Sequence, residues 1–137
     1  MIDLETNRIC YANAGHPKPM LVRRSLDAVE LLENQNGRSN PALGLFEGSI
    51  YPTSQASLSP NDLIMLYTDG LYDVEGKFEE LFGPEWLLDE VRQRQHLPVG
   101  VMFDELLQDV RIASGSGDFA DDVCLVGVEL AERRGGK

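Results

Sequence analysis

The chain has 137 residues, which suits one domain with a buried core and is short for two. Its content of 42% hydrophobic and 26% charged residues, with 13 glycines and 7 prolines, is typical of a globular protein and excludes a collagen-like or disordered chain. The 23 acidic and 12 basic residues give a formal net charge of -11, which disfavours nucleic acid and anionic membranes as partners.

The first half of the sequence predicts β-strands. Segments 8–15 and 19–24 are separated by a short proline-containing connection, a pattern typical of a β-hairpin. Residues 28–33 favour another short strand, and the Asn-Gly and Asn-Pro pairs within 34–44 predict a loop. Residues 49–58 are β-rich, but Pro52 restricts them to an edge or bulged strand because proline cannot donate to the ladder.

An apolar strand is predicted next. Residues 59–62, "SPND", favour a type I turn with Pro60 at its second position, which would close a hairpin between the flanking strands. Residues 63–67 are apolar with little alternation, which indicates a central strand covered on both faces.

The second half predicts two packing helices and a last strand. Pro84 opens the first helix, which reaches about Gln95, and Pro98 opens the second, with apolar residues at helical spacing and acidic residues on the solvated side. After a loop at 114–122, residues 123–131 read as an apolar strand, and 132–137 as a flexible tail. Helices segregated from strands indicate the α+β class, with helices packed on a largely antiparallel sheet or sandwich.

Cysteine usage and the N-terminal residues favour a cytoplasmic location. Cys10 and Cys124 lie in apolar runs without CxxC spacing, which predicts two reduced core thiols rather than a disulfide or zinc site. The first ten residues lack the features of a signal peptide, and no apolar run reaches the ~18 residues that a membrane helix needs. We therefore expect no membrane segment.

Three carboxylates flank the two most apolar predicted strands. Asp69 follows strand 63–67, and Asp121 and Asp122 precede strand 123–131. If these strands are antiparallel neighbours, the end of the first and the start of the second lie at one edge of the sheet, where strands are ~4.8 Å apart. The carboxylates are then expected to converge.

Converging acids need relief by protonation, by basic residues or by a cation. Lys77 is the basic residue closest in sequence to Asp69, so a cation is the favoured interpretation, and oxygen ligands favour Mg²⁺ or Mn²⁺. Gly70 would let the chain turn and let a ligand approach the backbone. The alternative is that these acids are turn residues of a plain α+β domain. His16 beside Pro17 is typical of a turn, and no serine or cysteine nucleophile pattern is present.

A family resemblance adds to this interpretation. Five segments in this order resemble the SpoIIE-like bacterial serine/threonine phosphatases of the PPM superfamily: "YANAGHPKPMLV" (11–22), "NPALGLF" (40–46), "LSPNDLIMLYTDGLYD" (58–73), "FGPEWLLDEV" (82–91) and "FADDVCLVGVEL" (119–130). The resemblance implies a sandwich of two antiparallel sheets flanked by helices, with two Mn²⁺ or Mg²⁺ ions at one edge. It implies a water activated by the metals as nucleophile, with no protein nucleophile.

The resemblance also assigns residues. It implies that Asp69 and Asp121 are metal ligands, that Asp122 and Gly70 support the site, and that His16 and Asn13 lie near the same edge in a supporting role. It implies a phosphoprotein substrate, commonly an anti-sigma-factor antagonist, and a sensory or receiver domain upstream.

One family motif has no counterpart before "NAGH": an early aspartate followed by a glycine-rich turn that also binds metal. We therefore expect residues 1–131 to be the C-terminal part of such a domain, lacking its N-terminal strands. Phosphatase activity of the isolated chain is expected to be weak or absent, and an exposed sheet edge is expected to favour self-association. The alternative function is a noncatalytic interaction module with the same fold.

Overall fold

The computed structural model describes residues 1–74, 82–115 and 117–131. The first sheet has the order β1-β2-β5, and the second sheet has the order β4-β3-β6-β7. All strand pairs are antiparallel. The strands are β1 (Ile2–Asp3), β2 (Arg8–Tyr11), β3 (Met20–Arg23), β4 (Ala28–Leu31), β5 (Ser54–Ser57), β6 (Leu63–Tyr67) and β7 (Leu125–Glu129).

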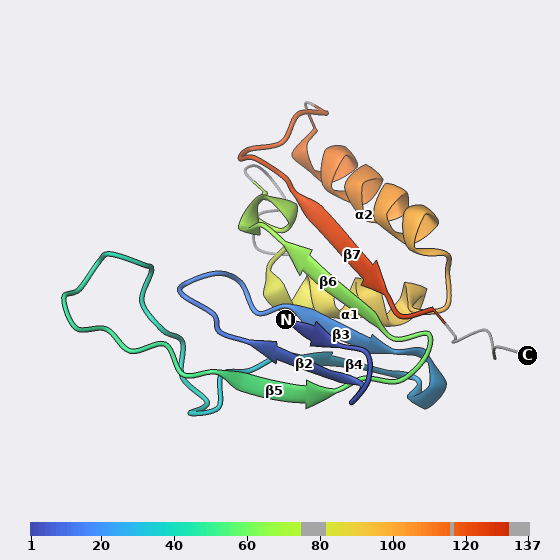
Figure 1. The fold of residues 1–137 in the computed structure, drawn as a ribbon. Helices are drawn as coiled ribbons and strands as arrows, with labels where there is room; N and C mark the ends of the chain where they lie inside the picture. The colour runs from blue at the N-terminus through green and yellow to red at the C-terminus, as the bar shows by residue number, and fades with distance from the viewer. Residues whose placement is uncertain (75–81, 116, 132–137) are drawn as a thin grey trace, which may run out of the picture.

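Two α-helices cover one face of the second sheet (Figure 1). Helix α1 (Pro84–Arg94) begins with the proline that the sequence predicts at its start, and α2 (Val99–Ser114) follows Pro98. The chain leaves α2 through Gly115, whose φ of 69° is the left-handed conformation that glycine adopts easily. Two short 3₁₀ helices, η1 (Arg24–Leu26) and η2 (Asp69–Leu71), follow β3 and β6. No helix in the described ranges is long and apolar enough to cross a membrane.

The layers enclose two apolar clusters. Between the helices and the second sheet, Met65, Leu87 and Leu106 are fully buried. Between the two sheets, Ile9 of β2 packs with Leu21 and Ile64 of the second sheet. The predicted sandwich flanked by helices is confirmed, and its layers hold β6 between β3 and β7 as a central strand.

Both predicted hairpins are wrong. Strand β2 pairs with β1 and β5 in the first sheet, whereas β3 pairs with β4 and β6 in the second. Strands β5 and β6 are likewise in different sheets. The turn between β5 and β6 is of type II rather than type I, since Asn61 has φ 69° at the third position and the Asp62 N–H donates to Ser59 O. A turn reverses the chain, but burial decides which sheet receives the next strand.

The acidic side of α2 is only partly solvated, which corrects the sequence interpretation. Arg94 of α1 donates from Nε to Glu105 at 2.8 Å and from a terminal nitrogen to Asp109 at 2.7 Å, and it also pairs with Glu90. Asp104 is exposed as expected. These ion pairs join the two helices, so part of the acidic surface is structural.

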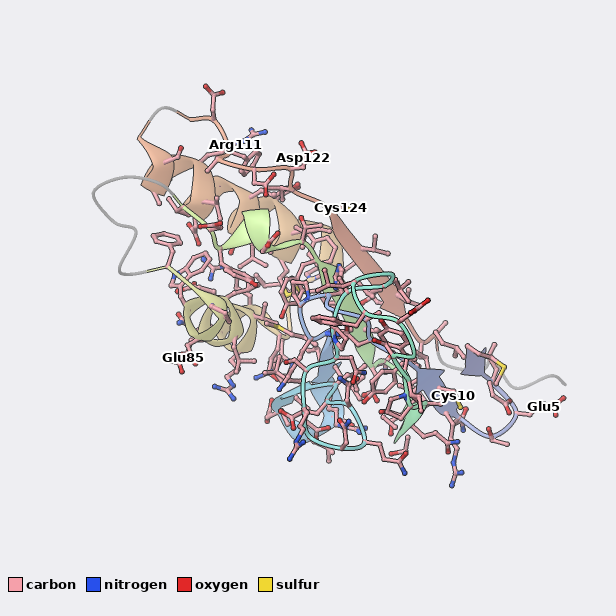
Figure 2. All side chains as sticks on the ribbon, turned by 90° about the vertical axis from the view of Figure 1, so that its left-hand side faces the viewer. Glu5, Cys10, Glu85, Arg111, Asp122 and Cys124 are labelled. Atoms are coloured by element: carbon pink, nitrogen blue, oxygen red, sulfur yellow. The ribbon has the colours of Figure 1, made fainter. Side chains whose placement is uncertain are left out.

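The two cysteines are free thiols and lie apart in the molecule (Figure 2). Cys10 is partly buried in β2, but Cys124, directly before β7, is exposed. The prediction of core thiols is therefore wrong for Cys124, because the sheet ends there and nothing among the described residues covers the side chain.

Candidate metal centre

Asp69 stands where β6 ends. Thr68 keeps an extended conformation (φ -88°, ψ 159°), and the chain then closes into η2, where the N–H groups of Tyr72 and Asp73 both donate to Asp69 O at 2.9 and 2.8 Å. Gly70 and Leu71 are buried, whereas Asp69 is exposed. The turn thus anchors the backbone and leaves the carboxylate facing solvent.

Thr68 ties this turn to the segment before β7. Its backbone N–H donates to Cys124 O at 3.1 Å, and its hydroxyl donates to Asp122 O at 2.8 Å. The same hydroxyl oxygen accepts a hydrogen bond from the Cys124 N–H at 2.9 Å. The last pair of the β6–β7 ladder is Tyr67 and Leu125, and the hydrogen bonds of Thr68 continue the contact between the two segments beyond it.

Gly70 lies directly against the backbone of the two adjacent acids. A Cβ atom here would be 2.7 Å from Asp122 O and 3.1 Å from Asp121 O. The sequence predicts a glycine that favours a sharp turn and ligand access; Gly70 lies in the turn η2, and the structure adds that the backbone of residues 121–122 packs directly against it. The structure thus brings the segments of Asp69, Asp121 and Asp122 to one edge of the second sheet, at the start of β7 (Figures 1 and 2).

The exposed acids form no ion pair with any described lysine, arginine or histidine. Asp121 accepts a hydrogen bond from the Asp122 N–H at 2.7 Å, which leaves lone pairs on its carboxylate. Exposed carboxylate oxygens without basic partners fit Mg²⁺ or Mn²⁺. However, no group of three or more His, Cys, Asp or Glu side chains in residues 1–74, 82–115 and 117–131 is arranged to hold a metal ion. Metal binding here would require additional ligands.

A polar cleft of about 380 Å³ adjoins Asp69. Asn13 and His16, which the sequence places near the site, line this cleft. The Asn13 side chain closes the turn that contains them, since it donates from Nδ2 to His16 O and accepts from the His16 N–H, both at 2.9 Å. Asn34 also lines the cleft, and its buried Oδ1 accepts no hydrogen bond from any described residue.

A single contact fixes the tautomer of His16. Its Nδ1 lies 2.9 Å from Pro17 O, and a carbonyl oxygen can only accept, so Nδ1 carries the proton. In the neutral ring, Nε2 therefore has the free lone pair. His16 can then accept a hydrogen bond from a group bound in the cleft. Its relation to Asp69 is that both residues line this cleft.

Two tyrosines connect the cleft with the core. Burial is the main cause that raises the pKa of Tyr72, with smaller contributions from the carboxylates of Asp69 and Asp73. Burial also raises the pKa of Tyr67 to about 12, and its hydroxyl donates to Lys18 O at 2.7 Å. Both phenols are thus neutral near pH 7, and Tyr72, which lines the cleft, offers a neutral O–H group.

Sequence reasoning missed Thr68, Tyr72 and Asn40 as parts of this site. Asn40 lines the cleft and donates from Nδ2 to Asn13 O at 2.9 Å. The segments that carry the resemblance contain all three residues, which was the available signal. Their contacts join distant parts of the chain, and no local spacing indicates such contacts.

Comparisons with known proteins agree with this architecture. A family model described as "Stage II sporulation protein E (SpoIIE)" matches residues 1–131. Phosphoserine phosphatase RsbP of Bacillus subtilis is 26% identical over 129 residues, which cover 94% of this chain and 29% of RsbP. The chain therefore spans less than a third of that relative.

Solved structures show the same fold. The SiaA-PP2C domain of Pseudomonas aeruginosa matches with a TM-score of 0.74 and 19% identity, covering 94% of this chain and 49% of that one. The Mn-presoaked phosphatase domain of SpoIIE from Bacillus subtilis matches with a TM-score of 0.69 and 17% identity, covering 100% of this chain and 57% of that one. At these identities the matches establish the PP2C-like fold.

Proposed function

The chain belongs to the SpoIIE family, and we propose that it forms part of a metal-dependent protein serine/threonine phosphatase domain. The observation that carries the proposal is the meeting of the Asp69 and Asp121–Asp122 segments at one sheet edge, beside a polar cleft. Exposed acids without basic partners suit divalent cations better than they suit an anionic substrate. The proposal therefore needs Mn²⁺ or Mg²⁺ at this edge, two ions in the complete domain.

The cations would supply the positive charge that acidifies a water molecule and neutralises the phosphoryl oxygens. The residues of this chain then have distinct tasks. Asp69 and Asp121 would hold the metals, while Thr68 and Gly70 keep their two segments in contact. His16, Asn13 and Tyr72 would bind the substrate residue in the cleft through hydrogen bonds.

The proposed substrate is a regulatory phosphoprotein such as an anti-sigma-factor antagonist. RsbP, the relative that matches 94% of this chain, is named a phosphoserine phosphatase, which supports a phosphoserine substrate. The proposal also includes a sensory or receiver domain in the same polypeptide and a cytoplasmic setting.

The test compares carboxylate variants of the full-length protein. Hydrolysis of a phosphoserine peptide is measured with added Mn²⁺, and Mn²⁺ binding is measured by calorimetry. We expect Asp69→Asn and Asp121→Asn to lower both activity and Mn²⁺ affinity at least tenfold, which is about 1.4 kcal/mol. Asp104→Asn on the exposed side of α2 is the matched control and should change neither. Equal Mn²⁺ binding by all three variants would remove these acids from the site.

A noncatalytic interaction module is the second candidate. It is favoured by the finding that no group of three or more His, Cys, Asp or Glu side chains among the described residues is arranged to hold a metal ion. Under this alternative, the full-length protein binds its partner without releasing phosphate and binds no Mn²⁺ through Asp69. The same experiment separates the two functions, because a module yields no phosphate and no calorimetric difference between wild type and Asp69→Asn.

A further inference from the structure

The segment between β4 and β5, residues 32–53, is long and contains no helix or strand. Figure 1 shows it as a loop that projects away from both sheets. Connections longer than about 12–15 residues without secondary structure are uncommon in compact domains and are often functional.

The base of this loop is held by specific contacts. The Tyr51 hydroxyl donates to Ala42 O at 3.1 Å, which closes the loop on itself. Asn40 bonds to Asn13 O, and a Cβ atom on Gly15 would be 2.9 Å from the backbone of Ala42. The loop is therefore packed against the turn whose residues line the cleft next to Asp69.

The outer part of the loop exposes large apolar side chains. Four of them fall within residues 43–50: Leu43 is 76% exposed, Leu45 63%, Phe46 63% and Ile50 83%. Glu47 is the charged residue of this stretch. Single exposed apolar residues are ordinary, but a group of them on one projecting loop indicates an interaction site.

We propose that Leu43, Leu45, Phe46 and Ile50 form a docking surface for the phosphoprotein substrate, which contacts them with an apolar patch beside its phosphorylated serine or threonine. This inference rests on the proposed phosphatase function. The substrate is the occupant because the loop base is bonded to the cleft lining, so a protein held by the loop is placed at the cleft.

Charge gives a second reason for an apolar docking surface. The chain has a formal net charge of -11, which repels a phosphorylated protein. Lys18 in the cleft lining already pairs with Glu33 at 2.7 Å. The proposed cations would act on the phosphate itself, so contacts with the rest of the substrate protein would have to come largely from groups that do not depend on charge. Exposed aromatic and aliphatic side chains are the groups that supply such contacts at protein interfaces.

The experiment uses the full-length protein with two substrates. The phosphorylated anti-sigma-factor antagonist of the same organism probes docking, and p-nitrophenyl phosphate is too small to extend from the cleft to the exposed apolar side chains of the outer loop. The test variant is Leu45→Ser with Phe46→Ser. Leu26→Ser is the matched control, because Leu26 is 67% exposed and lies away from the cleft. It belongs to η1, which follows the last residue of β3, whereas Lys18 of the cleft lining precedes the first residue of β3. Dissociation constants for the phosphoprotein are measured in an Asp69→Asn background.

We expect the double variant to lower kcat/KM on the phosphoprotein and to weaken its binding roughly tenfold to a hundredfold, a range typical of interface hot spots. Hydrolysis of p-nitrophenyl phosphate should stay within about twofold of wild type, as should every value for Leu26→Ser. If the phosphoprotein is hydrolysed and bound equally well by the double variant, or if both substrates lose activity equally, docking at this loop is refuted while the phosphatase function stands. If wild type hydrolyses neither substrate but the double variant still loses binding, the phosphatase function fails and the docking surface stands. Absence of phosphoprotein binding by the Asp69→Asn protein with an unaltered loop overturns the docking surface.

Discussion

Replacing Gly70 with alanine perturbs the contact that brings the candidate metal ligands together. The added Cβ atom would lie 2.7 Å from Asp122 O and 3.1 Å from Asp121 O. Both neighbours are backbone atoms, which cannot move aside by rotation of a side chain. The ends of β6 and β7 must therefore separate in this variant.

The size of the effect follows from what that separation breaks. Three hydrogen bonds of Thr68 join the two segments, and each contributes on the order of 1 kcal/mol net. Overpacking of a tight contact costs about 1–3 kcal/mol when the bonds partly survive. We expect Gly70→Ala to lose about 2–4 kcal/mol of unfolding free energy in urea, and to bind Mn²⁺ more weakly because its carboxylates move apart.

Two other glycines are matched controls. A Cβ atom on Gly127 would be 2.9 Å from Val99 Cγ2 and 3.1 Å from Phe103 Cζ, which are side-chain atoms that can adjust, so Gly127→Ala should lose less. A Cβ atom on Gly100 in α2 would meet nothing within 4 Å beyond its own helix backbone and chain neighbours, and alanine there should stabilise the helix by up to about 1 kcal/mol. A Gly70→Ala protein as stable as Gly100→Ala, with unchanged Mn²⁺ affinity, would refute this reasoning.

Three further predictions concern pH, a buried charge and the sheet edge. Burial raises the pKa of Tyr67 from 10.0 to about 12, so its contribution to stability is complete below pH 10 and is lost as the pH rises from 10 to about 12. The urea midpoint of Tyr67→Phe should accordingly fall less than that of wild type between about pH 9.5 and 11.5. Asp62 is fully buried and pairs with Arg23 at 3.4 Å, so Asp62→Asn should lose about 3 kcal/mol in urea unfolding, whereas the exposed Asp104→Asn should lose none. Strand β7 lies at the edge of its sheet with Val128 exposed, so we expect the isolated chain to self-associate in light scattering and Val128→Lys to reduce it; a wild-type monomer at high concentration would contradict this.

Local sequence pattern was sufficient for most elements of the fold. Strand β6 and both helices occur where apolar runs and proline positions predict them. Burial on one face leaves a periodic signal in the helices, and burial on both faces leaves a continuous apolar run in β6. Strand β1 was missed, since its two residues are too short for any period. The partners of β2 and β5 were missed as well, because strand pairing depends on contacts between segments that lie far apart in the chain.

The candidate site was predictable to the same extent. The antiparallel pairing of β6 and β7 brings Asp69 near Asp121, which follows from two apolar segments being neighbours in one sheet. The cleft was not predictable, because it forms where the Asn13 turn meets Asn40 in the loop before β5. The role of Gly70 was not predictable either, since an Asp-Gly pair has the same sequence in a simple turn and where two segments of one chain pack closely.

The arrangement separates the groups that would perform the chemistry from those that hold the edge together. Asp69 and Asp121 are exposed and contribute side chains to solvent, so the local packing does not depend on their charge. Thr68 and Gly70, on either side of Asp69, make the contacts with the facing segment. The two segments that carry the acids are thus held together by hydrogen bonds and packing of adjacent residues, not by interactions of the carboxylates themselves. A divalent cation bound by these exposed acids would add its binding free energy to the stability of the folded state, because it binds the folded arrangement of the two segments and not the unfolded chain.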